Sequence, residues 1–252
     1  MAVVHHTTLT PSKLELLTSW LPTQPWYLGV GSAPDLTKAG GFRLDDPDGE
    51  VGLEFMAVTD ASGDQPVTYH VPLSYRGAPL EGSEHALVGN TEHGVLGRRW
   101  IYDGTHDPVL MAQLFALLTG KAAPQDQNAS DALDPSVTAS CTASSLTGAS
   151  VSGASVVITP VEVVNGPHGT HVLLAMDATR HLTLHIHRAL QPQRGTASTP
   201  ASATEVVGHI VTVWQLPDGT TARGPFVTAH TPQSGRSLIR NGTDARRAGH
   251  AG

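Results

Sequence analysis

The sequence predicts an α+β protein in two parts, on three observations. A leucine-rich segment capped by Asp107 indicates a helix, and strict alternation at residues 67–75 indicates an antiparallel strand. In the second half, the composition shifts to Ser, Thr, Ala, Gly and Val, which is typical of a β-rich unit. We therefore expect an α+β domain at residues 1–120 and a β domain at residues 137–230.

Two helices are expected in the first domain. The first begins at Thr10-Pro11, where a capping residue is followed by proline, and ends at Pro22. The second begins in the same way at Asp107-Pro108. In both segments leucines recur at helical spacing, at Leu14, Leu17, Leu21, Leu110, Leu114, Leu117 and Leu118.

The segment between the helices predicts a small antiparallel sheet. Strands are expected at residues 50–59, 67–75, 84–88 and 96–102. In the second of these, one face carries Val67, Tyr69, Val71, Leu73 and Tyr75. Pro72 in the same strand indicates an edge position or a bulge, because proline cannot donate a ladder hydrogen bond. Residues 30–41 are Gly-rich and are expected to be irregular.

The rest of the chain predicts a linker, a β domain and a disordered tail. Residues 121–136 have no hydrophobic periodicity and are expected to be the linker. Residues 231–252 are expected to be disordered. Between them, turn residues separate five expected strands, at residues 154–164, 170–176, 181–187, 206–216 and 221–229.

Composition and charge exclude several classes of protein. The formal net charge of -7 argues against a surface for nucleic acid or anionic membranes. Cys141 is the single cysteine, so an internal disulfide and a cysteine-rich metal site are excluded. The sequence has no long apolar run and no secretory signal pattern. We therefore expect a cytoplasmic protein without a cofactor.

Several landmarks, in the same order, resemble the N-terminal cap of bacterial maltokinases. These are the first helix followed by LPTQPWYLG, then the segment from Tyr69 to Tyr75, Leu87-Val88-Gly89, and Tyr102-Asp103 followed by His106-Asp107-Pro108. The resemblance covers roughly residues 9–120. It implies a cystatin-like antiparallel sheet that carries a helix, and a relation to enzymes that phosphorylate maltose with ATP.

The second half is similar to the N-terminal lobe of the kinase in the same family. SLTGASVSGASVVI corresponds to its first hairpin, HLTLHIHRALQP to the strand of its ATP-binding lysine, and VVGHIVTVWQLPDGTTARGPFV to its final hairpin. The resemblance implies a kinase-N-lobe-like antiparallel β domain with His185 in the lysine position. Unlike lysine, histidine is mostly neutral at pH 7. We expect no kinase activity, since the sequence shows no catalytic lobe.

A group of polar residues near the domain junction forms the main candidate binding site. Its members, together with one residue of the second domain, are His93, Arg98, Arg99, Trp100, Asp103, His106 and His185. A carboxylate beside a histidine suits general acid–base chemistry. Structural roles compete with this interpretation, because Asp107 is already expected to cap a helix and Asp103-Gly104 is typical of a turn. We predict no catalytic residue here.

Histidines on one face of an expected strand are a weak candidate for metal binding. His181, His185 and His187 share this face, and His171 of the preceding strand faces them. Side chains two residues apart on a strand can converge on zinc with help from a neighbouring strand. A half-exposed polar face explains the same pattern, and we expect no bound metal.

These observations predict a non-catalytic binding or scaffolding protein of α-glucan, maltose or trehalose metabolism. Two alternatives stay open: an enzyme, either a maltokinase-like ATP-dependent sugar phosphotransferase that uses a separate catalytic chain or a glucan-active enzyme, and a small-ligand carrier with a groove between its sheets. A carbohydrate is the expected ligand. The expected partner is a second copy of the chain or a protein of α-glucan metabolism, with the apolar run from Val206 to Val213 buried between copies.

Overall fold

The described residues of the computed structural model are 9–29, 31, 33–129, 132–142, 158–193 and 205–231. In this part of the chain two α-helices and three short 3₁₀ segments accompany the strands: α1 (Lys13–Trp20), η1 (Leu21–Thr23), η2 (Glu84–Ala86), η3 (Gly104–His106) and α2 (Pro108–Leu118). The strands of the first half are β1 (Leu9–Thr10), β2 (Leu36–Leu44), β3 (Gly52–Asp60), β4 (Val67–Arg76), β5 (Leu87–His93) and β6 (Gly97–Asp103). Those of the second half are β7 (Thr138–Cys141), β8 (Thr159–Gly166), β9 (Gly169–Ala175), β10 (His181–Ile186), β11 (Val206–Gln215) and β12 (Thr221–His230).

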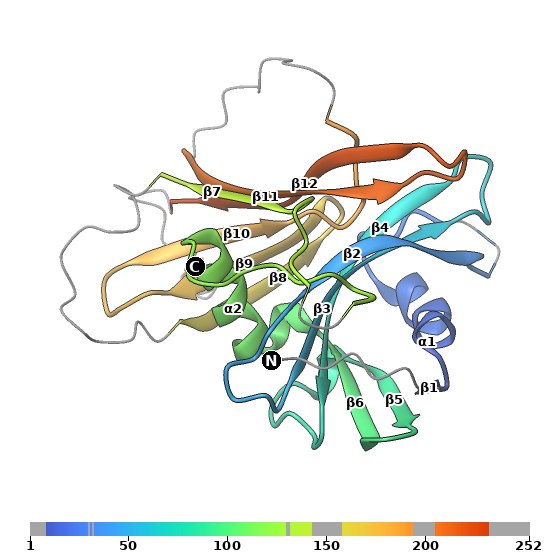
Figure 1. Ribbon diagram of the computed structural model, residues 1–252, viewed down its shortest axis with the longest axis horizontal. Coiled ribbons are helices and arrows are strands. Elements are labelled where there is room, and N and C mark those ends of the chain that lie inside the picture. Colours follow the sequence, from blue (N-terminus) through green and yellow to red (C-terminus); the bar gives the residue numbers. More distant parts are fainter. Residues whose placement is uncertain are drawn as a thin grey trace, which may run out of the picture.

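One antiparallel sheet contains all of these strands, so the fold is β-rich with few helices. The strand order is β1-β5-β6-β4-β3-β2-β11-β12-β10-β9-β8, and β7 pairs with β11 beside this path. Strands β1 to β6 and β7 to β12 thus form two halves of the sheet, which meet where β2 pairs with β11. Figure 1 shows α1 beside the first half and α2 beside the second.

Most of the strands that sequence patterns predicted are confirmed. β3, β4 and β6 occupy three of the four predicted segments of the first half, and β8 to β12 overlap the five of the second. The remaining strand, predicted at residues 84–88, begins only at Leu87, because Glu84–Ala86 form the 3₁₀ segment η2. Residues 154–157, at the start of the first predicted strand of the second half, lie outside the described residues, as do 232–252 of the predicted disordered tail. The cystatin-like and kinase-N-lobe-like details of the predicted fold class stay predictions.

One face of β3 and β4 packs against α1. The predicted face of β4 is confirmed, because Tyr69, Val71 and Leu73 are buried there and Val67 and Tyr75 pack at its margin. These residues, with Leu17, Trp20, Leu21, Trp26, Met56, Val58 and Ile101, form what we call the α1 core. The alternation of β4 therefore reflects a sheet face covered by a helix.

The opposite face of β3 belongs to a second core that both halves of the sheet share. Phe42 of β2 stacks on Phe55 of β3, with ring centroids 4.5 Å apart, and also contacts Phe226 of β12 at 6.3 Å. This shared core also contains the apolar residues of α2 and the inner residues of β9, β10 and β11. Because β3 is buried on both faces, its residues Phe55 to Val58 are all apolar rather than alternating.

The apolar run on β11 is covered within the chain. Val207 and Ile210 are 1% and 0% exposed and belong to the shared core, which α2 also lines. The argument that a second copy buries this run is wrong for Val207 and Ile210, because the shared core already covers them. A homodimer stays a prediction without this support.

The predicted division of the chain into two domains joined by a linker at residues 121–136 also stays a prediction. The structure shows that this segment packs on the sheet. The backbones of Arg43 and Gln125 exchange hydrogen bonds of 2.9 Å in both directions. The Arg43 side chain also donates to the carbonyl of Asp126 at 3.2 Å. The segment therefore adds a short bridge to the edge of β2 that faces away from β3.

Three local predictions need correction. α1 begins after Ser12 rather than Thr10, because Ser12 and Glu15 form a capping box in which each side chain accepts a hydrogen bond from the other's backbone. Pro72 lies neither at a sheet edge nor at a bulge, because it pairs with Phe55 in the regular ladder of β3 and β4. On its other side, β4 pairs with β6 from Leu73 onward and bridges to Ala189 at Tyr69, and Pro72 lies between these two contacts. Its missing N–H therefore removes no ladder bond.

The third correction is the Gly-rich stretch, which forms most of β2 rather than an irregular loop. Its ladder with β3 is interrupted by a bulge between Lys38 and Gly40. Gly40 and Gly41 have φ values of 142° and 125°, a region that other residues rarely adopt. Next to the bulge, Gly40 pairs with Ala57 of β3 on one edge and with Trp214 of β11 on the other.

A buried ion pair joins the two halves at the edge of β4 that faces away from β3. The Arg188 guanidinium, 0% exposed, donates to Asp103 at 2.6 Å and to Thr170 at 2.8 Å. It also lies over the Trp26 ring, 4.8 Å from its centroid. The Arg188 carbonyl accepts a 2.8 Å hydrogen bond from the backbone N–H of His70. Arg188, which lies just beyond the end of β10, thus contacts β4, β6, β9 and the α1 core.

His70 occupies an apolar site next to this ion pair. It is 0% exposed, and its ring lies 4.3 Å from the Phe226 centroid and 6.1 Å from that of Phe55. Neither ring nitrogen has a hydrogen-bond partner among the described residues. Burial, reinforced by the positive charge of Arg188, holds the pKa of His70 well below its usual value.

We predict that Asp103→Asn lowers the free energy of unfolding by about 3–5 kcal/mol, because it leaves the buried Arg188 charge without a counter-charge. Urea denaturation followed by circular dichroism measures this. The matched control is Glu92→Gln, which breaks the exposed pair of Glu92 and Arg98 at 3.8 Å and should cost less than about 1 kcal/mol. Equal midpoints for the Asp103 variant and wild type would show that the ion pair does not hold the halves together.

A second prediction concerns pH. The folded-state pKa of His70 lies below its unfolded value of 6.5, so its contribution to stability is complete above pH 6.5 and is lost as the pH falls. Each such histidine steepens the decline by up to about 1.4 kcal/mol per pH unit. His70→Leu keeps the backbone hydrogen bond and should show a shallower decline than wild type between pH 6 and pH 5. Parallel declines in urea melts would contradict this.

Candidate functional site

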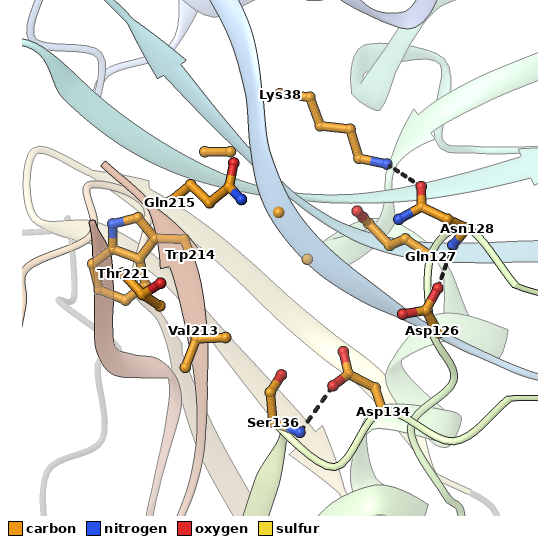
Figure 2. Close-up of a pocket in the computed structure, with 13 residues that line it drawn as sticks. Lys38, Asp126, Gln127, Asn128, Asp134, Ser136, Val213, Trp214, Gln215 and Thr221 are labelled. Carbon is orange, nitrogen blue, oxygen red and sulfur yellow. Dashed lines mark hydrogen bonds between the residues drawn. The ribbon is translucent and has the colours of Figure 1, made fainter. Parts of the chain in front are cut away.

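A polar pocket lies where the two halves of the sheet meet. Its volume is about 420 Å³, within the range of small-molecule sites. The wall is built from three segments: the bulged part of β2, the end of β11, and the segment after Gln125. The lining residues are Lys38, Ala39, Gly40, Gly41, Asp126, Gln127, Asn128, Asp134, Ser136, Val213, Trp214, Gln215 and Thr221. Figure 2 shows β11 on one side of the pocket and residues 126–128 on the other.

The glycines of β2 permit this pocket to form. A Cβ atom on Gly41 would lie 2.1 Å from the carbonyl oxygen of Phe55 and 2.6 Å from the amide nitrogen of Gln127. Both distances are far below van der Waals contact, so a larger residue would displace Gln127 from the strand. The Gly-rich stretch is therefore needed for close approach of backbone and side chains.

The wall opposite β11 is ordered by backbone hydrogen bonds to two aspartates. Asp126 Oδ1 accepts from the N–H groups of Asn128 and Ala129 at 2.7 and 2.9 Å, and Asp134 Oδ1 accepts from Ser136 at 2.9 Å. These bonds to Asn128 and Ala129 lower the pKa of Asp126. Asp126 is thus held as an ionised carboxylate at the pocket surface.

Lys38 contributes the positive charge of the lining. Its ammonium donates to Asn128 Oδ1 at 3.2 Å (Figure 2). The side chain reaches solvent, but partial desolvation against the sheet lowers its pKa, an effect that the negative charge of Glu54 opposes. Lys38 and Asn128 therefore link the β2 wall to the opposite wall.

A buried carboxylate lies behind the pocket. Glu54 of β3 is 4% exposed; its Oε2 accepts from Lys13 at 2.6 Å and from the Tyr75 hydroxyl at 2.5 Å. Burial opposes ionisation of Glu54, but the charge of Lys13 and these hydrogen bonds outweigh it and lower its pKa. Its Oε1 accepts from Gln127 Nε2 at 3.3 Å, which connects this network to the pocket lining.

The structure does not bring the predicted candidate residues together. Asp103 lies in the buried ion pair with Arg188. His106 contacts His85, with Nδ1 and Nε2 3.2 Å apart. Asp107 caps α2, as predicted, by accepting from Val109, and it also pairs with Arg76 at 2.6 Å. The acid–base cluster near the junction thus consists of groups with separate structural partners.

The other predicted residues of the first half lie on the β5–β6 hairpin. His93 Nδ1 accepts from the backbone of Val95 and Leu96 in its turn. Arg98 lies over the Trp100 ring, 5.7 Å from its centroid, and Arg99 follows it on β6. A binding role for these residues stays a prediction. The other three tryptophans, Trp20, Trp26 and Trp214, are core residues.

The predicted histidine face consists of stacked rings. The ring of His185 lies 4.5 Å from that of His171 and 4.4 Å from that of His187, with interplanar angles of 19° and 24°. We call these three residues the histidine ladder. His185 Nε2 donates to the carbonyl of His168 at 3.2 Å, and His187 Nε2 lies 2.7 Å from the Thr228 hydroxyl.

Desolvation lowers the pKa of all three ladder histidines, and that of His187 falls to about 4. The ladder is therefore neutral at pH 7. Among the residues that the structure describes, no group of three or more His, Cys, Asp or Glu side chains is arranged to hold a metal ion. His181 lies at the start of β10, apart from the stack.

Sequence reasoning missed the pocket because its lining comes from segments without periodicity. Lys38 and the glycines lie in the stretch expected to be irregular, and Asp126 to Ser136 lie in the expected linker. The available signal was the density of Gly residues, which indicated a place where the backbone approaches another segment closely.

Comparison with known proteins identifies the first half of the sheet. The sequence model of the maltokinase N-terminal cap domain matches residues 20–107, from the end of α1 to the N-cap of α2. No curated protein matches the chain. None of the described helices is long and apolar enough to cross a membrane. The matched segment contains β2 to β6, and therefore the β2 wall of the pocket and Glu54 behind it. Residues 20–107 of this chain belong to the maltokinase N-terminal cap domain family.

Proposed function

We propose that this chain is a non-catalytic binding or scaffolding protein related to maltokinase, with a role in α-glucan, maltose or trehalose metabolism. The family of residues 20–107 supports the relation to maltokinase. The observation that carries the non-catalytic part is the state of His185 in the histidine ladder.

His185 lies where the resemblance implies the ATP-binding lysine. Its strand, β10, pairs with β12 of the hairpin β11–β12, the segment assigned to the final hairpin of the lobe, which supports that one assignment. The segment assigned to the phosphate-covering hairpin, SLTGASVSGASVVI, lies almost wholly outside the described residues.

A ladder histidine is a poor replacement for that lysine. Phosphoryl transfer depends on positioning and on cations that neutralise the phosphate oxygens. The His185 ring is neutral at pH 7, stacks on both neighbours, and its Nε2–H is already bonded to His168. It therefore offers no permanent charge to an ATP phosphate. Phosphotransfer with a separate catalytic chain and a glucan-active enzyme stay as weaker alternatives.

A second candidate function is a small-ligand carrier, which the junction pocket favours. The pocket has the volume of a small-molecule site, and its polar side chains come from both halves of the sheet. A carrier would bind a carbohydrate of the same metabolism. Association with a protein of α-glucan metabolism, or with a second copy of the chain, is also proposed.

We predict no saturable binding of Mg-ATP up to millimolar concentration in isothermal titration calorimetry, because the position of the lysine holds a neutral, stacked imidazole. The matched variant is His185→Lys, which restores a cation at that position. Micromolar affinity of the wild-type chain for Mg-ATP would contradict the non-catalytic proposal. Binding by the variant alone would support it, because the missing cation would then be the cause.

A further inference from the structure

We infer that the junction pocket binds an uncharged saccharide unit and discriminates against its phosphate ester, with Gln127 positioned by Glu54 as a specificity-determining residue. This inference rests on the proposed carrier function and names its site and class of ligand. It follows from the charges of the lining, the polar groups left unpaired there, and the support that the buried carboxylate gives.

The charges of the lining disfavour an anionic ligand. Lys38 carries one positive charge, whereas Asp126 and Asp134 each carry one negative charge. The ammonium of Lys38 is already bonded to Asn128, on the same wall as Asp126 (Figure 2). A phosphate brings close to two further negative charges at pH 7, and like charges at short distance repel. A neutral ligand meets no such cost.

The polar groups of the lining suit hydroxyl groups. Oδ1 of both aspartates accepts backbone hydrogen bonds, while Oδ2 of each accepts none from a described residue. Donors are also present, since the lining includes the amides of Asn128 and Gln215 and the hydroxyl of Thr221. A sugar hydroxyl both donates and accepts, so a polyhydroxylated ring can satisfy this mixture at several points.

Gln127 is a buried lining residue whose amide has a fixed orientation. It is 8% exposed, and its Nε2 donates to Glu54 Oε1 at 3.3 Å. This bond fixes which end of the amide is the donor, because the carboxylate can only accept. The amide oxygen of Gln127 is then available as an acceptor for a ligand hydroxyl.

Glu54 acts on a ligand only through Gln127, so it is a positioning residue. Lys13 and Tyr75 hold its other oxygen, and the charge of Lys13 keeps it ionised although it is buried. An ionised acceptor gives a stronger hydrogen bond than a neutral one. On the strand side, only a glycine at position 41 leaves room for the Gln127 amide. The orientation of the Gln127 amide is therefore supported by Glu54 on one side and by the space at Gly41 on the other.

The test is calorimetric titration of the full chain with maltose and, separately, with maltose carrying a phosphate monoester. We expect saturable binding of maltose and at least about tenfold weaker binding of the ester, the equivalent of about 1.4 kcal/mol. Gln127→Leu removes the amide at similar size and should weaken maltose binding about tenfold, the cost of a lost buried hydrogen bond. The matched control is Gln65→Leu in the exposed β3–β4 turn, which should bind like wild type.

A second variant keeps the test valid if Gln127→Leu does not fold. Asn128→Ala changes an exposed residue of the same wall and should also weaken binding, by a few-fold. Circular dichroism checks that each variant is folded.

The outcomes separate the inference from the proposed function. If wild type binds neither maltose nor any other saccharide tested, the carrier function fails and the inference fails with it. If wild type binds maltose but both pocket variants bind equally well, the carrier function stands and this site is wrong. If the phosphate ester binds as tightly as maltose, the charge argument is overturned.

Discussion

The buried guanidinium of Arg188 is the interaction on which the arrangement of the two halves depends. A charge that is removed from water is tolerated only when it is paired and hydrogen-bonded, and here the partners come from different parts of the chain. Asp103 closes the end of β6, Thr170 lies on β9, and Trp26 belongs to the α1 core. Any sliding of β10 relative to the first half would leave this charge without its partners, so the ion pair specifies one relative position even where apolar packing would tolerate others.

The two halves also meet where β2 pairs with β11. The shared core fills the space between the halves with aromatic rings and with α2, so most of the junction is closed. At the bulge of β2, Gly40 pairs with Ala57 of β3 on one edge and with Trp214 of β11 on the other. The segment after Gln125 lines the opening with amides and carboxylates. The pocket is thus a product of joining two halves, and neither half would form it alone.

The second half of the sheet presents a different surface. Its inner face is covered by the shared core, whereas its outer face carries the histidine ladder. Stacking and desolvation keep these imidazoles neutral, so the strand that the family resemblance associates with a permanent cation has none. The relation to maltokinase and the lack of a kinase-like charge are therefore compatible, because the cap family is identified by residues 20–107 and the histidines lie outside them.

The sequence by itself determined the elements whose signals are local. The alternation of β4, the helix after Asp107 and five of the six strands of the second half could be predicted, because backbone periodicity and capping depend on residues close in the chain. Only the tertiary structure decided which distant residues contact one another. Arg188, Gly41 and Gln127 have no distinctive local pattern, and each acquires its role from a residue far along the chain, Asp103, Phe55 and Glu54 respectively. Burial of a charge, close approach of a backbone and orientation of an amide are properties of the packed chain, so only the folded structure could reveal them.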